Sequence, residues 1–108
     1  MSDAQPITGC RPGDIAEHVF ICGDPARVDR ITQSWDEKRE VCSVREYTIV
    51  SGTKDGVELT AASHGIGAPG TAVLVEEIIK LGAKTILRIG NSGGLEPSLE
   101  LGDLAITT

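Results

Sequence analysis

Aromatic residues are scarce in this 108-residue sequence, which contains only Phe20, Trp35 and Tyr47. Its core must therefore be aliphatic. An aliphatic core is typical of a β-sheet rich in Val, Ile and Leu that helices cover on both faces. The sequence also lacks a run of basic residues, and its formal net charge is −6. General binding to nucleic acid requires clustered Lys and Arg. We therefore expect no nucleic-acid partner.

Long apolar segments are absent as well. The longest uncharged stretch, residues 59–75, is interrupted by His64, several glycines and Pro69, so we expect no membrane span. Residues 1–9 lack the basic and apolar regions of a signal peptide. Cys10, Cys22 and Cys42 are far apart and form no zinc motif, which indicates three reduced thiols. These features predict a cytoplasmic protein that binds no metal ion.

Alternating strand and helix patterns predict an α/β fold. A mixed β-sheet flanked by helices is expected, because strands separated by a helix favour parallel pairing and Asp55-Gly56 favours an antiparallel hairpin. Pro25 and Pro69 suit the first turns of two helices, and Gly82 suits the end of the second. The expected strands are 18–23, 41–51, 57–63, 84–90 and 103–107, and the expected helices are 25–34 and 68–81.

The sequence ends at Ile106-Thr107-Thr108, inside or just after an expected strand. With no following helix, that strand would have an unshielded edge, and such an edge favours pairing with another chain. Two helices are also too few to cover both faces of five strands. We therefore expect residues 1–108 to be the N-terminal part of one larger domain, in an incomplete α/β fold that associates with further copies.

Two expected strands each lead into a glycine turn with an arginine close by. Gly23-Asp24-Pro25-Ala26-Arg27 follows the first strand, and Arg88-Ile89-Gly90-Asn91 belongs to a later one. Ligands of open α/β sheets bind outside the carboxyl ends of the strands, and a guanidinium within an apolar run needs a charged partner. The rigid arginine fork suits phosphate oxygens. This pattern predicts a phosphate site, and the alternative for Arg88 is an ion pair with Glu46 or Glu76.

Other segments give weaker indications. His64 lies in the glycine-rich junction 63–70, where it is either a base or donor or a structural residue. Arg45-Glu46-Tyr47 opens an expected strand and by itself indicates an exposed edge. No paired carboxylates, serine nucleophile elbow or Gly-Lys-Ser/Thr phosphate loop is present. We therefore assign no catalytic residue.

Taken together, these segments resemble the N-terminal half of the nucleoside phosphorylase family, which includes uridine phosphorylase and the hexameric purine nucleoside phosphorylases. The resemblance covers about residues 7–108 and rests on the motifs Gly23-Asp24-Pro25-x-Arg27, Arg45-Glu46-Tyr47, His64-Gly65-Ile66-Gly67-x-Pro69, Glu76-Glu77, Leu81-Gly82, Arg88-x-Gly90 and Gly102-Asp103. Members of this family act in nucleoside salvage. They need no cofactor and use inorganic phosphate as co-substrate to cleave the N-glycosidic bond, giving a base and ribose 1-phosphate.

The resemblance assigns roles to particular residues. It implies that phosphate is bound by Gly23, Arg27, Arg88 and Asn91. Arg45 would reach the phosphate of a neighbouring subunit in a homo-oligomer. The ribose would contact Ile66 and Asn91.

Three positions depart from the family pattern. Asn91 stands where the family usually has Ser or Thr, Gly70 replaces a usual Ser, and Ile7 stands where a histidine reaches a neighbour's ribose. The Gly-Ile-Gly around Ile66 resembles uridine phosphorylases, whereas Ser63-His64-Gly65 resembles the purine enzymes, so the base is left open.

The family's base-recognition and ribose-glutamate segments would lie beyond position 108. Whether this chain is itself an enzyme therefore stays open. The alternatives to a phosphorylase are a hydrolytic nucleosidase of the same fold and a non-catalytic phosphate-binding or assembly module.

Overall fold

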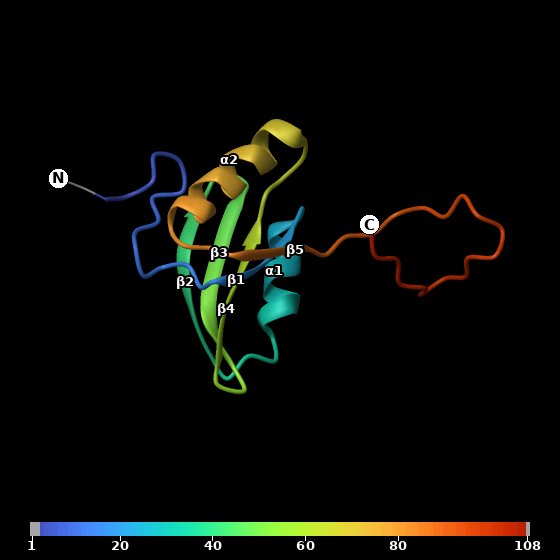
Figure 1. Cartoon of the computed structure of the whole chain (residues 1–108), viewed down its shortest axis with the longest axis horizontal. Helices are drawn as coiled ribbons and strands as arrows, with labels where there is room; N and C mark the ends of the chain where they lie inside the picture. Colours follow the sequence, from blue (N-terminus) through green and yellow to red (C-terminus); the bar gives the residue numbers. More distant parts are fainter. Residues whose placement is uncertain (1–2, 108) are drawn as a thin grey trace.

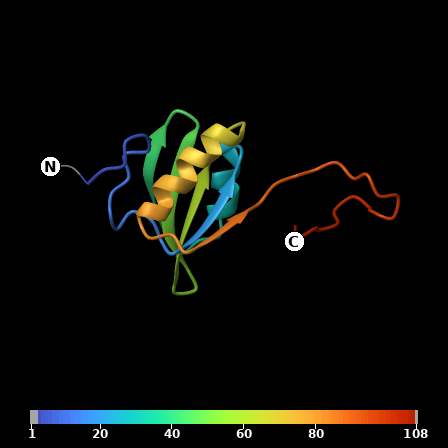
Figure 2. The same ribbon diagram turned by 45° about the horizontal axis from the view of Figure 1, so that its top comes forward.

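In the computed structural model, which describes residues 3–107, one mixed sheet of five strands carries a helix on each face (Figures 1 and 2). Strand β1 lies between β4 and β5 and is parallel to both, while β2, β3 and β4 are antiparallel neighbours. The sheet order is β2-β3-β4-β1-β5. The elements are β1 (His18–Cys22), α1 (Pro25–Thr32), β2 (Glu37–Val44), β3 (Tyr47–Lys54), β4 (Val57–Ser63), α2 (Ala68–Lys80) and β5 (Thr85–Arg88). The predicted mixed α/β fold is confirmed.

Both helices begin where the prolines predict. Pro25 lies in the first turn of α1, where its missing N–H costs nothing. Asp24 caps this helix, because its carboxylate accepts the Ala26 N–H at 2.9 Å. Gly67, with φ 95°, precedes α2, and Gly82, with φ 106°, follows it. The positive φ values at both ends of α2 favour glycine.

The hairpin between β3 and β4 is also confirmed, since Asp55 and Gly56 have φ values of 52° and 80°. The single strand expected over 41–51 is wrong. Two strands, β2 and β3, occupy this region, and Arg45-Glu46 forms the turn between them, with Arg45 at φ 53°. The turn escaped prediction because neither residue is a common turn former. Arg45-Glu46-Tyr47 is thus a turn that leads into β3, rather than an edge strand.

Each face of the sheet has its own aliphatic core. Helix α1 lies against β1, β3 and β4, and its Val28 packs with Cys22, Val50 and Ala61. Helix α2 covers the opposite face with a larger cluster that includes Ile21, Ile49, Ala62, Leu74 and Ile78. The three cysteines are buried and free. Neither helix of residues 3–107 is long and apolar enough to cross a membrane.

The N-terminal segment is attached to α2 by a buried carboxylate. Glu77 accepts the backbone N–H groups of Ile7 at 3.0 Å and Thr8 at 2.9 Å. Two charge-assisted hydrogen bonds compensate for the burial of this carboxylate. Ile7 is thereby placed beside α2.

The strand expected over 103–107 is wrong. Residues 89–107 contain no helix or strand and extend away from the sheet (Figures 1 and 2). A strand needs a hydrogen-bonded neighbour, and within 3–107 no segment pairs with this one. Leu101 and Leu104 are almost fully exposed there. The predicted domain range is 1–108, and its residues 1, 2 and 108 lie outside the described residues.

Strand β5 is an edge strand, and this corrects the expected setting of Arg88. Leu87 is 54% exposed and Ile89 is 38% exposed, and Arg88 is itself exposed. The apolar run of residues 84–90 favours a buried strand. However, in the described part of the chain only β1 pairs with β5.

Candidate anion-binding site

A cavity of about 780 Å³ lies at the carboxyl ends of β1, β4 and β5. These three strands are parallel, so the loops that follow them meet at one edge of the sheet, where α/β folds bind ligands. The cavity is lined by Gly23, Asp24, Pro25, Arg27, Glu46, Gly65, Ile66, Arg88, Gly90 and Asn91.

The structure brings most of the predicted site residues to this one cavity. Gly23, Arg27, Ile66, Arg88 and Asn91 all line it. Arg45, which the resemblance assigned to a neighbouring subunit's phosphate, is exposed in the turn between β2 and β3 and is not a lining residue.

One side of the cavity is formed by residues 23–27, which we call the α1 arm. Local hydrogen bonds hold it: the Asp24 carboxylate caps the helix, and the Asp24 carbonyl accepts the Arg27 N–H at 2.9 Å. The Arg27 side chain is half-buried, and its guanidinium has no hydrogen bond or ion pair within residues 3–107. The positive end of the α1 dipole lies at the same place.

The other side is formed by residues 88–91, which we call the β5 arm. The Ile89 N–H donates to the Ile21 carbonyl at 2.8 Å, which continues the pairing with β1. The Arg88 Nε–H donates to His64 Nε2 at 3.0 Å. A Cβ atom at Gly90 would collide with Arg88 Nη1, so the absence of a side chain at Gly90 lets the guanidinium fold over this turn.

The ion pair proposed as an alternative for Arg88 is not formed. In residues 3–107 the two ion pairs join Arg39 to Asp14 and Lys84 to Glu17. Neither Glu46 nor Glu76 neutralises Arg88. The cavity therefore holds two guanidinium groups that have no acidic partner in the described structure.

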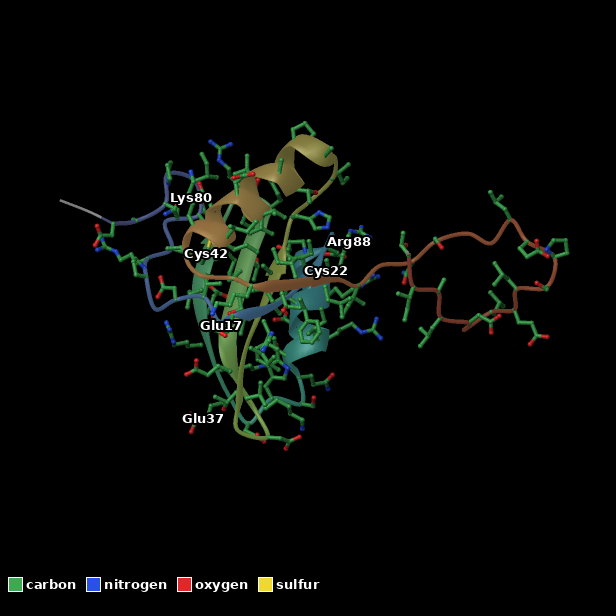
Figure 3. All side chains as sticks on the ribbon, in the orientation of Figure 1. Glu17, Cys22, Glu37, Cys42, Lys80 and Arg88 are labelled. Carbon is green, nitrogen blue, oxygen red and sulfur yellow. The ribbon has the colours of Figure 1, made fainter. Side chains whose placement is uncertain are left out.

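Cys22 is the last residue of β1, so it directly precedes the α1 arm and belongs to the strand that pairs with β5. Burial raises the pKa of the Cys22 thiol above its ordinary value, and the Asp24 charge adds to this effect. The charges of Arg27 and Arg88 oppose the rise in pKa. Both guanidinium groups thus lower the pKa of the same thiol. Figure 3 shows Cys22 and Arg88 at the same end of the sheet.

Glu46 lines the cavity from the turn between β2 and β3, where the sequence suggested only an ion pair with Arg88. Ser63 Oγ holds this turn, because it donates to the Glu46 carbonyl at 2.6 Å and accepts the Thr48 N–H at 2.8 Å. Gly65, with φ 73°, leaves room for Glu46, whose Cγ would lie 2.5 Å from a Cβ at this position. The available signal was the Arg45-Glu46-Tyr47 motif.

Tyr47 and Gly70 tie this wall to α2. The Tyr47 hydroxyl donates to the Gly70 carbonyl at 2.8 Å. Burial, and then the neighbouring Glu46, raises the pKa of Tyr47. No group of three or more His, Cys, Asp or Glu residues in the described ranges is arranged to hold a metal ion.

Comparison with known proteins places these residues in a family. The family model described as "Phosphorylase superfamily" matches residues 17–108. The chain is 45% identical over 97 residues to a uridine phosphorylase of Thermococcus kodakarensis, covering 90% of this chain and 35% of that protein. It is 43% identical over 104 residues to a guanosine phosphorylase of Halorubrum lacusprofundi, covering 96% of this chain and 43% of that protein.

Solved structures give the same result. A purine nucleoside phosphorylase from Toxoplasma gondii, crystallised in complex with immucillin-H, superposes with a TM-score of 0.89 at 40% identity. That match covers 94% of this chain and 41% of the solved one. The chain thus spans between 35% and 43% of the length of these three relatives.

Proposed function

Because this chain belongs to the nucleoside phosphorylase family of the phosphorylase superfamily, we propose that its cavity binds the inorganic phosphate used to cleave a nucleoside. The observation that best supports this proposal is the convergence of Arg27 and Arg88, neither of which has an acidic partner in the described structure, on one cavity. Two guanidinium groups at one place, neither held in an ion pair, favour an anion with several oxygen atoms.

The proposed phosphate contacts come from both arms. Arg27 and Arg88 would donate charge-assisted hydrogen bonds, and the Gly23 N–H and the start of α1 would add backbone donors and the helix dipole. A phosphate oxygen would attack the anomeric carbon as the carbon–nitrogen bond breaks, and the base would leave with the bonding electrons. The arginines would hold the anion against the positive charge that develops on the sugar. We propose no cofactor for this step.

Ile66 and Asn91 are the proposed ribose contacts. Ile66 is fully exposed beside the cavity, where its side chain offers an apolar surface to a sugar ring. The Asn91 amide can donate to phosphate and accept from a hydroxyl, so it can replace the Ser or Thr expected at this position. Arg45 is exposed outside the cavity, and we propose that it reaches the phosphate of a second copy in a homo-oligomer.

The two arginines favour phosphorolysis over hydrolysis, because an attacking water molecule carries no charge for them to bind. The substrate would be a pyrimidine or purine nucleoside, since the relatives include uridine and guanosine phosphorylases. We propose that residues 1–108 belong to one domain of this type, and that this domain works in nucleoside salvage in the cytoplasm.

A thermal-shift experiment tests the phosphate site. Sodium phosphate should raise the melting temperature of the chain, because a ligand at about 100 times its Kd stabilises the native state by about 2.7 kcal/mol. Sodium chloride at the same ionic strength is the control. Equal shifts in the two salts would contradict a phosphate site.

A further inference from the structure

His64 is buried beside the cavity without lining it. Its side chain is only 4% exposed, at the point where β4 leads into the glycine loop before α2. Its N–H donates to the Cys22 carbonyl at 2.9 Å, and the next N–H, of Gly65, donates to the Gly23 carbonyl at 3.0 Å. The backbone of His64 is thus fixed against the end of β1.

The hydrogen bonds of the ring determine its tautomer. Arginine has only donors, so His64 Nε2, 3.0 Å from Arg88 Nε, must accept. The proton is then on Nδ1, which lies 2.8 Å from the Gly65 carbonyl oxygen and 3.1 Å from Thr71 Oγ1. The Thr71 hydroxyl donates to the Gly67 carbonyl at 3.0 Å and is therefore free to accept. Every contact is satisfied by a neutral ring with Nδ1–H.

This arrangement excludes one of the roles considered for His64. A general base needs a free lone pair, and the only lone pair of this ring, on Nε2, already accepts the Arg88 Nε–H. Nδ1 faces a carbonyl oxygen that can only accept. The ring has no site left for a substrate proton.

We propose that His64 is a positioning residue that holds Arg88 so that its two Nη groups remain available to an anion. The bond uses the Nε–H of the guanidinium and leaves the terminal fork unpaired within residues 3–107. Gly90 leaves the space that the folded guanidinium occupies. The proposal rests on the proposed function only in taking that anion to be phosphate.

This support matters because Arg88 lies on an exposed edge strand. A long side chain that must be immobilised on binding reduces affinity, and a preorganised one does not. The bond to the buried His64 fixes the side chain before the anion arrives. A chain of hydrogen bonds thus runs from Thr71 in α2 through His64 to Arg88 at the cavity.

Two substitutions separate this role from a general structural one. The Gln oxygen of His64→Gln lies near the position of Nε2 and keeps an acceptor for Arg88. The shorter His64→Asn keeps a donor near Nδ1 for Gly65 and loses that acceptor. The Kd for inorganic phosphate, measured by calorimetry, should rise about five- to tenfold in His64→Asn, the effect of releasing one flexible side chain. In His64→Gln the Kd for inorganic phosphate should stay within about twofold of its value in the unsubstituted chain, because the acceptor for Arg88 is kept.

Nuclear magnetic resonance tests the contact without phosphate. The ¹⁵N shifts of His64 should show Nδ1 protonated and Nε2 bare, and the Arg88 Nε–H should exchange with water more slowly than in His64→Asn. A proton on Nε2, or equal exchange rates, would overturn the proposal. Equal phosphate affinity in His64→Asn and the unsubstituted chain would also overturn it while the phosphate site stands. If the unsubstituted chain binds no phosphate but shows the expected tautomer and slow exchange, the contact between His64 and Arg88 is supported and the proposed function is contradicted.

Discussion

The two arms of the cavity each contribute one arginine but are built in different ways. The α1 arm, residues 23–27, is held by neighbours in sequence, because Asp24 caps the helix three residues before Arg27. The β5 arm, residues 88–91, lies on an edge strand, and Arg88 is held by His64, which is 24 residues away in the sequence. One arm is a local structure, whereas the other depends on how β1, β4 and β5 assemble.

This difference predicts how each arm responds to substitution. The α1 arm keeps its backbone donors and helix dipole when Arg27 is lost. The β5 arm offers the anion the Arg88 fork and the neutral Asn91 amide, with no helix dipole to compensate for the loss of Arg88. Substitutions in the β5 arm should therefore reduce phosphate binding the most.

The largest effect is expected for Arg88→Ala. Losing a guanidinium fork removes charge-assisted hydrogen bonds, which should weaken phosphate binding by about 100-fold. The melting temperature without phosphate should also fall, because the buried His64 Nε2 loses its hydrogen-bond donor. Calorimetry measures the affinity, and Lys84→Ala, which removes an exposed positive charge just before β5, is the matched control. Equal affinities in the two variants would contradict the role of Arg88.

Arg27→Ala should have a smaller effect. We expect phosphate affinity to fall by about tenfold, since the backbone donors of the α1 arm remain. Arg30→Ala, on the exposed last turn of the same helix, should bind phosphate as the unsubstituted chain does. If Arg27→Ala weakens binding more than Arg88→Ala, the proposed order of the two arms is wrong.

Asp24→Ala separates the stability of the α1 arm from its charge. Loss of the helix cap should lower the free energy of unfolding by about 1 kcal/mol. Phosphate affinity should not fall, because a negative charge beside the cavity is removed at the same time. Urea denaturation measures the stability, and Asp29→Ala, exposed on the same helix, is the control. A large loss of phosphate affinity would indicate that Asp24 contacts the ligand.

The pKa of Cys22 reports the electrostatic effect of both arms and should show the smallest changes. Its raised pKa means that the folded state favours the neutral thiol, so this contribution to stability is present at low pH and is lost as pH rises above the thiol's ordinary pKa. Removing either arginine should raise the pKa further, and Arg27→Ala more than Arg88→Ala. A ¹³Cβ titration of Cys22 measures the shifts. A lower pKa in either variant would contradict the placement of the two charges.

The structure of the α1 arm could be predicted from the sequence, whereas that of the β5 arm could be predicted only in part. Pro25 and Gly23 indicated the turn and helix that carry Arg27, because their preferences act within a few residues. Arg88 lines the cavity, but its strand is an exposed edge rather than the buried strand that its apolar neighbours favour. Its contact with His64 depends on β1 lying between β4 and β5, which no local pattern specifies. The turn at Arg45-Glu46 was missed because neither residue is a common turn former. The strand expected over 103–107 needs a hydrogen-bonded neighbour, which no segment of residues 3–107 supplies.

The central claim is that both arms bind one anion. A crystal structure of the chain grown with inorganic phosphate tests it most directly. The account predicts a single phosphate whose oxygens lie about 2.9 Å from guanidinium nitrogens of both Arg27 and Arg88 and close to the Gly23 N–H. Phosphate bound to only one of the two arginines, or guanidinium groups that point to separate sites, would contradict it.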